Sequence, residues 1–314
     1  PRCTPNSAET EQWWGDTTNP TTAQLISDLN TGRAWAVYSA HSGPSGWSGD
    51  PPLSSSDMPN FGNTDMYPIA HGHSCQSNMW QSYDDVFGEA AVIQPGKGFV
   101  AYWGGSNSTY WDGDDWLERG FFDALVEADM AANAGDWDGQ FSNVAACYSG
   151  LTEVTLNGGG SAGETYYWEI YNLNGDPTLD PYTRAPSALN VGVPPVVPPG
   201  ATDTFEVTVT DASAGAVAGA LIGVTQGGVL LGAGYTDSTG VATFHIDGPT
   251  PGQDLLVRAT AHNALPTDET AFKRRIEEGM VEGQDRRRVL CMAHQHLRAR
   301  EEVGPHLRRP TPGL

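Results

Sequence analysis

The sequence predicts two folded parts: an α/β sheet with flanking helices, followed by an all-β sandwich. In the first 190 residues, apolar runs of strand length alternate with stretches of helical spacing, which indicates an α/β layer. Beyond a proline-rich linker over residues 194–200, short alternating strands lie between Gly, Asp and Ser turns at about ten-residue spacing, as is typical of a sandwich. We therefore expect one domain over 1–190 and a second over 191–265.

The first part contains three apolar runs of strand length. They are nearly continuous rather than alternating, which favours a parallel sheet buried on both faces. The predicted strands cover residues 34–40, 66–70 and 98–103. Residues 166–171, which are rich in aromatic side chains, are predicted to add one more strand.

Helical spacing of apolar residues recurs between and around these strands. Residues 21–31 predict a short amphipathic helix that stops before Gly32. Two further helices are predicted over residues 84–93 and 115–132.

Side chains that can carry chemistry follow the ends of the predicted strands. His41 comes directly after the first strand, Cys75 comes shortly after the second, and Gly-Gly-Ser at 104–106 closes the third. In α/β sheets, ligands bind outside the carboxyl ends of the strands. We therefore expect an active site at this edge.

A cysteine and a histidine on adjacent strand ends form a workable catalytic pair. The thiolate is the nucleophile, so the cysteine needs a base, and the acyl oxyanion needs backbone donors. Gly72 lets the chain turn before Cys75, whose own N–H is available as such a donor. Taken alone, a buried cysteine such as Cys75 is more often a small apolar residue than a nucleophile.

Four segments in order along the chain resemble the gingipain family of cysteine peptidases, peptidase family C25. Residues 30–47 resemble that family's strand and catalytic-histidine loop, and residues 65–89 its strand, catalytic cysteine and following helix. Residues 97–111 resemble the next strand and its Ser-rich loop ending in Tyr-Trp, and residues 166–186 the closing Gly-Asp-Pro segment. The resemblance extends from about residue 20 to residue 265.

This resemblance implies a caspase-like peptidase domain followed by an immunoglobulin-like domain. Carried over residue by residue, it makes Cys75 the nucleophile and His41 the general base. It implies an oxyanion hole formed by the backbone N–H groups of Ser42 and Cys75, although the family usually has Gly where Ser42 stands. No counterpart of the family's further amino-terminal α/β subdomain is recognisable.

The resemblance also places three side chains at the substrate pocket. Trp111 falls where the family has an aromatic wall, Asp114 where lysine-specific members have an acidic residue, and Ser39 near a hydroxyl. A carboxylate at the base of a pocket pairs with an ammonium group, so cleavage after basic residues is expected. From residue patterns alone, Trp111 is equally compatible with a core aromatic, and the acidic residues at 112–115 with a solvated or calcium-binding loop.

Charge is distributed unevenly. The net charge is −22, yet residues 1–271 carry −26, because residues 273–309 hold 10 of the 16 Lys and Arg. Because the strongly negative part of the chain over residues 1–271 repels phosphate backbones, nucleic acid is not an expected partner. The basic, weakly patterned residues 266–314 are expected to be a disordered tail.

Cysteine spacing and hydropathy exclude other classes. Cys3, Cys75, Cys147 and Cys291 contain no C-x-x-C pair, so a zinc ribbon is excluded, and nothing fixes a disulfide pairing. No apolar run approaches the ~20 residues of a membrane span. The chemistry requires no cofactor, and calcium is expected only as a structural ion.

The function that we predict is a secreted, extracellular or cell-surface cysteine endopeptidase acting on proteins or peptides. Two alternatives remain open. One is a catalytically inactive surface or adhesion fragment of a peptidase. The other is a metal-binding protein, because His71, His73 and Cys75 alternate along one strand and, with His41, supply four zinc-ligand side chains.

Overall fold

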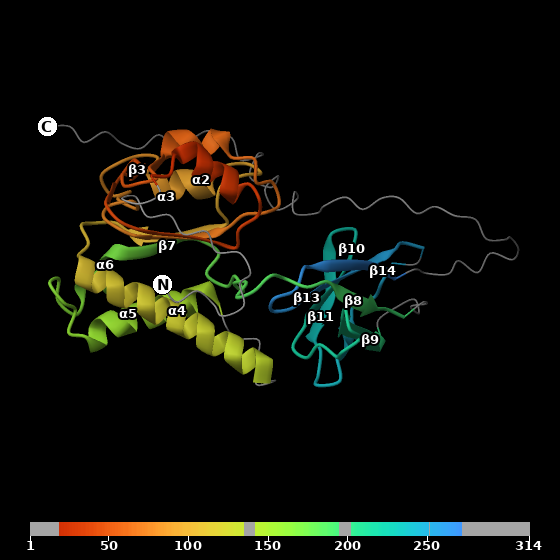
Figure 1. Ribbon diagram of the computed structural model, residues 1–314. Helices are drawn as coiled ribbons and strands as arrows, with labels where there is room; N and C mark the ends of the chain where they lie inside the picture. Colours follow the sequence, from red (N-terminus) through yellow and green to blue (C-terminus); the bar gives the residue numbers. More distant parts are fainter. Residues whose placement is uncertain (1–18, 135–141, 195–201, 251, 272–314) are drawn as a thin grey trace, which may run out of the picture. The chain divides into compact units, whose positions relative to one another are not determined.

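The structure, a computed structural model, describes residues 19–134, 142–194, 202–250 and 252–271 (Figure 1). Its first part is built on a four-stranded sheet with the order β1-β5-β6-β7. The first three strands run parallel and β7 runs antiparallel to β6. The strands are β1 (Trp35–Ser39), β5 (Ile69–His73), β6 (Ala101–Gly105) and β7 (Tyr171–Gly175).

Helices cover both faces of this sheet (Figure 1). On one face lie α2 (Thr22–Leu29) and α3 (Phe87–Val92), and on the other α4 (Trp111–Ala134) and α5 (Asn143–Leu156). The short helix α6 (Tyr166–Ile170) leads directly into β7. Because β5 and β6 are buried on both faces, their side chains alternate between the two helical layers.

The three expected parallel strands and the expected helices of this part are present, with shifted ends. The second and third strands lie two to three residues later than expected, so that the sheet includes His71 and His73. The prediction of a strand over 166–171 is wrong, because Tyr166–Ile170 is helical and only Tyr171 begins a strand. Helix α5 was not predicted. It is rich in Ala, Ser and Thr, and both its small and its bulky residues are buried, which leaves no clear apolar stripe.

A small three-stranded sheet follows β1 and contacts the larger one through Trp47. It is formed by β2 (Ser42–Gly43), β3 (Gly46–Trp47) and β4 (Leu53–Ser54). The Trp47 ring stacks on Tyr38 at a centroid distance of 4.5 Å, and its Nε1 donates to the Tyr102 hydroxyl at 3.1 Å.

Gly72 makes room for that Tyr102 hydroxyl. A Cβ atom at position 72 would lie 2.1 Å from the Tyr102 Oη, well inside van der Waals contact. The sheet therefore depends on a glycine three residues before Cys75, for close packing rather than for an unusual φ angle.

The second part is all β and packs two sheets around one apolar core. One sheet has the order β11-β10-β13-β14, with β10 (Leu221–Gln226), β11 (Val229–Tyr235), β13 (Leu255–Thr260) and β14 (Thr267–Ala271). The other has the order β12-β9-β8, with β8 (Leu189–Gly192), β9 (Thr202–Asp211) and β12 (Val241–Ile246). The sandwich prediction is confirmed, and its immunoglobulin-like character stays a prediction.

The predicted tail begins too early. Thr267–Ala271 forms β14, which pairs antiparallel with β13 along its whole length. Its alternation of Thr with Asp and Glu resembles loop composition, and pairing with β13 decides its conformation. Residues 272–314, and residues 195–200 of the predicted linker, lie outside the described residues.

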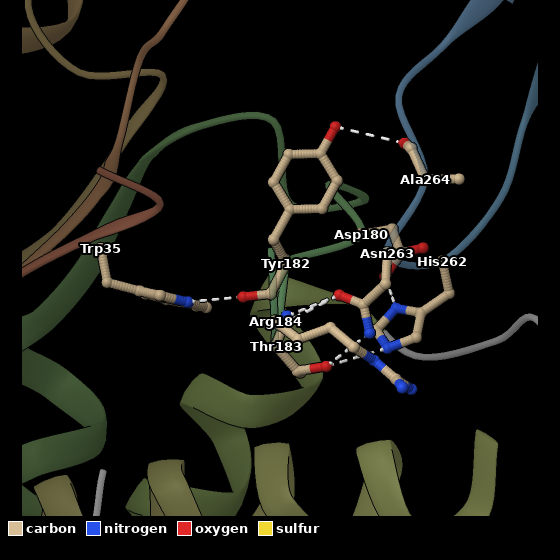
Figure 2. A network of polar contacts seen from close by, with 8 residues as sticks. All are labelled: Trp35, Asp180, Tyr182, Thr183, Arg184, His262, Asn263 and Ala264. Carbon is tan, nitrogen blue, oxygen red and sulfur yellow. Dashed lines mark hydrogen bonds and ion pairs between the residues drawn. The ribbon is translucent and has the colours of Figure 1, made fainter. Parts of the chain in front are cut away.

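A polar network joins the segment after β7 to the loop between β13 and β14 (Figure 2). Asn263 Oδ1 accepts from the Thr183 N–H at 2.8 Å, and its Nδ2 donates to the Thr183 hydroxyl at 2.7 Å. Tyr182 donates its hydroxyl to the Ala264 carbonyl at 3.3 Å, and its own carbonyl accepts from the Trp35 indole at 2.7 Å. This network therefore extends from the loop of the sandwich to the first residue of β1.

Candidate active site

Parallel pairing of β1 and β5 brings His41 and Cys75 to the same edge. Ser39 is the register partner of His73, so His41 and Cys75 each follow two residues beyond this last pair. The two loops touch directly, because the Ser42 hydroxyl donates to the Cys75 carbonyl. The structure thus places the predicted base and nucleophile in neighbouring, hydrogen-bonded loops.

The backbone around His41 is held by its carbonyl. That oxygen accepts from the Tyr38 hydroxyl at 2.6 Å and from the Ser48 N–H at 2.9 Å. The imidazole is exposed and meets the Trp111 ring edge-on at a centroid distance of 5.7 Å. Trp111, the first residue of α4, is itself 62% exposed. Its indole therefore borders the site from solvent and is not a core aromatic.

Cys75 is a free, partly exposed cysteine whose sulfur faces the loop after β6. The Thr109 N–H donates to Sγ at 3.3 Å. Behind it, the Gln76 N–H donates to the Asn107 carbonyl at 3.0 Å. The buried Asn78 amide bridges β6 and β7 by donating to the Gly104 and Asn172 carbonyls. The loop that carries Cys75 is therefore fixed to the sheet on the side opposite His41.

Asp114 lies beneath this loop and is only 4% exposed. Its Oδ2 accepts from the Thr109 hydroxyl at 2.6 Å, and its Oδ1 accepts from Tyr171 at 2.6 Å and Tyr167 at 3.0 Å. Burial raises the pKa of the Asp114 carboxyl, while these three hydroxyl donors oppose that rise. The carboxylate predicted to contact substrate is thus already bonded to three protein groups.

Glu118 is a second carboxylate on the same helix, one turn further along. It is partly exposed and lies close to Ser39, at the carboxyl end of β1. Burial raises the pKa of Glu118, and the nearby Asp115 charge adds to the rise. Ser39 and Glu118 therefore place a hydroxyl and a carboxylate close together on the side of the site that Trp111 borders.

His71 and His73 lie side by side in β5, buried against α4. Their ring centroids are 5.9 Å apart, and the His71 ring is 4.0 Å from that of Phe121. All four ring nitrogens lack a hydrogen-bond partner in the part of the chain that the structure describes. Burial lowers the pKa of His73 to about 4 and that of His71 well below its usual value. Asn143 lies close enough to His71 to oppose this shift, but not in hydrogen-bonding geometry.

The structure does not bring the four side chains of the alternative zinc site together. Among the described residues, no three His, Cys, Asp or Glu side chains are grouped so as to hold a metal ion. His71 and His73 point into the core beside Phe121, whereas His41 is exposed at the sheet edge. The alternation along β5 therefore places two histidines together and leaves the other ligands of the proposed zinc site elsewhere.

The acidic residues at 112–115 serve several structural roles. Asp112 accepts from both the N–H and the hydroxyl of Ser161 at 2.9 Å, and Asp115 forms an ion pair with Arg119 one turn later. These acidic side chains do not converge on one point, since Asp114 faces the core.

Three residues near the nucleophile were not singled out from the sequence: Thr109, Tyr167 and Tyr171. Tyr167 and Tyr171 are four residues apart, the spacing of neighbours on a helix face, and that was the available signal. Thr109 belongs to a Ser/Thr-rich loop in which no residue type stands out. Only the three-dimensional structure brings these side chains to Asp114.

A family model described as Peptidase family C25 matches residues 4–182. This match covers more than half of the chain. The chain belongs to peptidase family C25. The predicted resemblance is thereby confirmed, and the family supports a cysteine peptidase function.

Curated C25 relatives come from Porphyromonas gingivalis. Lys-gingipain W83 is 30% identical over 238 residues, which are 69% of this chain and 13% of that protein. Lys-gingipain HG66 is 28% identical over 241 residues, with coverage of 70% and 13%. The chain thus spans only about an eighth of the length of these relatives.

Solved structures agree with the C25 fold. A structure titled "Structure of Protease" superposes with a TM-score of 0.64 at 25% identity, covering 78% of this chain and 55% of the other. The Arg-specific cysteine proteinase gingipain R superposes with a TM-score of 0.64 at 17% identity, covering 80% and 55%. None of the described helices is long and apolar enough to cross a membrane.

Proposed function

We propose that this chain is a secreted cysteine endopeptidase in which Cys75 is the nucleophile and His41 the general base. The observation that carries the proposal is the common edge of β1 and β5. There, two loops that each begin after the same register pair bear a thiol and an imidazole, and a Ser42–Cys75 hydrogen bond joins the loops. Membership of family C25 supports the same reaction class.

The reaction proceeds through a thioester. His41 takes the proton from the Cys75 thiol, and the sulfur attacks the scissile carbonyl carbon to form a tetrahedral oxyanion. The C–N bond then breaks, and the imidazolium gives its proton to the leaving amine. Water, deprotonated by His41, hydrolyses the thioester and restores the thiol. No cofactor takes part in these steps, and calcium would serve only as a structural ion.

Backbone N–H groups of Cys75 and Ser42 are proposed to stabilise the oxyanion. Ser42 keeps a backbone donor where the family usually has Gly, and its side chain is turned away toward the Cys75 carbonyl. The hydroxyl is therefore used to join the two loops, and the backbone N–H is the group proposed to bind the oxyanion.

A basic residue before the cut is proposed to bind between Trp111 and the acidic side of α4. Trp111 is exposed and borders His41, so that it can cover the aliphatic stem of Lys or Arg. Asp114 and Glu118 are the candidate carboxylates. Glu118, partly exposed and close to Ser39, is the better placed of the two, because Asp114 is buried under three hydroxyl donors.

An inactive surface or adhesion fragment is the second candidate. The observation that favours it is coverage: this chain spans 13% of the length of Lys-gingipain W83. In that case the fold would bind partners without cleaving them, and the thiol of Cys75 would show no special reactivity.

Site-resolved alkylation tests the proposal. The chain is treated with iodoacetamide, or with chloromethyl ketones of Lys and Arg, and the adducts are located by peptide mass mapping. Cys75 is expected to react faster than the same cysteine in the urea-unfolded chain, and His41→Ala is expected to slow it at least tenfold.

The matched control is Cys147, which is free but 1% exposed and whose pKa is raised by burial. Cys75→Ala is expected to abolish peptide cleavage, whereas Cys147→Ala leaves it in place. A Cys75 that alkylates no faster in the native chain than in urea, and cleavage that survives Cys75→Ala, would both reject the proposal.

A further inference from the structure

Asp114 is linked to the nucleophile through one residue. The Thr109 hydroxyl donates to Asp114 Oδ2 at 2.6 Å, while the Thr109 N–H donates to Cys75 Sγ at 3.3 Å. A single threonine therefore connects a buried carboxylate to the Cys75 sulfur. Its N–H makes the shortest contact with Sγ, and its hydroxyl and carbonyl oxygens lie 3.8 Å from the same atom.

The carboxylate is itself held rigidly. Tyr171, the first residue of β7, and Tyr167, in α6, donate to Asp114 Oδ1 at 2.6 and 3.0 Å. The Tyr167 oxygen also accepts from the Tyr110 N–H at 2.9 Å. The turn at residues 109–110 is thus fastened at both of its residues to groups anchored in the sheet and α6.

We infer that Asp114 and Thr109 position the Cys75 sulfur by holding the Thr109 N–H against it, a role distinct from substrate recognition. An N–H group aimed at sulfur stabilises the thiolate over the thiol, because hydrogen bonds to charged groups are stronger than those to neutral ones. Asp114 is hydrogen-bonded to Thr109 and not to the sulfur, so that it acts on the sulfur only through Thr109, as a positioning residue. The inference rests on Cys75 being the nucleophile.

Burial explains why an aspartate suits this position. At 4% exposure the carboxylate has lost most of its hydration, and three hydroxyl donors replace it. Such a network has one low-energy arrangement, since any rotation of the Thr109 side chain leaves a buried acceptor without its donor. The same arrangement fixes the direction of the Thr109 N–H.

The test compares Thr109→Val with Thr109→Ser. Valine keeps the shape and the backbone N–H of threonine but loses the hydroxyl that binds Asp114, whereas serine keeps it. Thr109→Val is expected to slow Cys75 alkylation by iodoacetamide about tenfold at neutral pH, and to lower kcat with KM nearly unchanged. Thr109→Ser is expected to restore most of both values.

Alkylation of the buried Cys147 reports unfolding in the same sample. If Thr109→Val leaves the Cys75 rate unchanged while Cys147 stays protected, the inference is overturned. The proposed function is tested separately, because it fails when wild-type Cys75 itself shows no enhanced reactivity over the urea-unfolded chain.

A double variant separates positioning from simple charge. If valine acts only by leaving the Asp114 charge less neutralised, adding Asp114→Asn restores the wild-type alkylation rate, and this result would also overturn the inference. If valine acts by releasing the turn, Thr109→Val/Asp114→Asn remains as slow as Thr109→Val.

Discussion

At the scale of single residues, the two carboxylates on α4 differ in what already binds them. Asp114 is bonded to three hydroxyl groups and is nearly inaccessible, whereas Glu118 is partly exposed and lies close to Ser39. A Lys or Arg side chain from a substrate can reach Glu118 without breaking a buried network. We therefore expect substitutions at Asp114 and at Glu118 to have different effects on the kinetics of cleavage.

Glu118→Gln is expected to lower kcat/KM for substrates with Lys or Arg before the cut by about tenfold or more, mainly through KM. The reason is the loss of a charge-assisted hydrogen bond to the substrate cation. Cleavage assays on paired peptides that differ only in that residue provide the measurement. Glu127→Gln, on an exposed part of the same helix, is the matched control. Unchanged kinetics in Glu118→Gln, together with a raised KM in Asp114→Asn, would assign the pocket carboxylate to Asp114.

At the scale of elements, β5 places two buried histidines next to the active edge. Both have a lowered pKa because burial disfavours the charged ring. The unfolded chain takes up these protons near the ordinary histidine pKa of about 6.5, and the folded chain only near 4 for His73. Stability contributed by the neutral rings is therefore complete above about pH 6.5 and is lost as the pH falls toward 4.

For His73 alone this loss amounts to about 3 kcal/mol of unfolding free energy between pH 6.5 and 4. Urea unfolding at a series of pH values measures it. His71→Phe is expected to flatten the profile and to raise stability at acid pH, because phenylalanine fills the space beside Phe121 without unsatisfied nitrogens. The control is His245→Gln, at a solvent-facing position in β12. A profile as steep in His71→Phe as in the wild type would contradict this account.

The helices and strands could be predicted from the sequence where the spacing of apolar residues was sufficient to distinguish them. His41 and Cys75 could be placed at one edge because each follows an apolar run of strand length, and parallel strands bring such ends together. The helix at Tyr166–Ile170 was not predictable in this way, because its aromatic residues fit a strand equally well and its burial against α4 and β7 decides the matter. The hydrogen bond between Thr109 and Asp114 could not be predicted either, because it depends on how the loop after β6 packs against the first turn of α4.

At the scale of the whole molecule, Asn263 holds the segment after β7 to the sandwich loop (Figure 2). Its side chain makes hydrogen bonds to the Thr183 N–H, the Thr183 hydroxyl and the Arg184 N–H, and its backbone has a φ of 54°. Asparagine tolerates this left-handed conformation better than most residues. One side chain thus serves both the turn and the connection.

Asn263→Ala is expected to lower the unfolding free energy by about 2 kcal/mol, through lost hydrogen bonds and backbone strain. Asn263→Gly removes the same side chain without the strain, so the difference between the two variants gives the strain less the entropy cost of ordering glycine. Differential scanning calorimetry is the measurement, with limited proteolysis to locate newly accessible bonds near residues 182–190. Wild-type melting and proteolysis in both variants would show that this network does not stabilise the connection.

Glycine at position 72 restricts the substitutions that this protein can tolerate. Any larger residue at position 72 would collide with the Tyr102 hydroxyl oxygen. This position is three residues before Cys75, the proposed nucleophile. A compensating change at 102 would in turn free the Trp47 indole and loosen the loop that follows His41. We therefore expect sequence variation among homologues or selected variants to lie in the surrounding loops. Gly72, Tyr102 and Trp47 are expected to occur together.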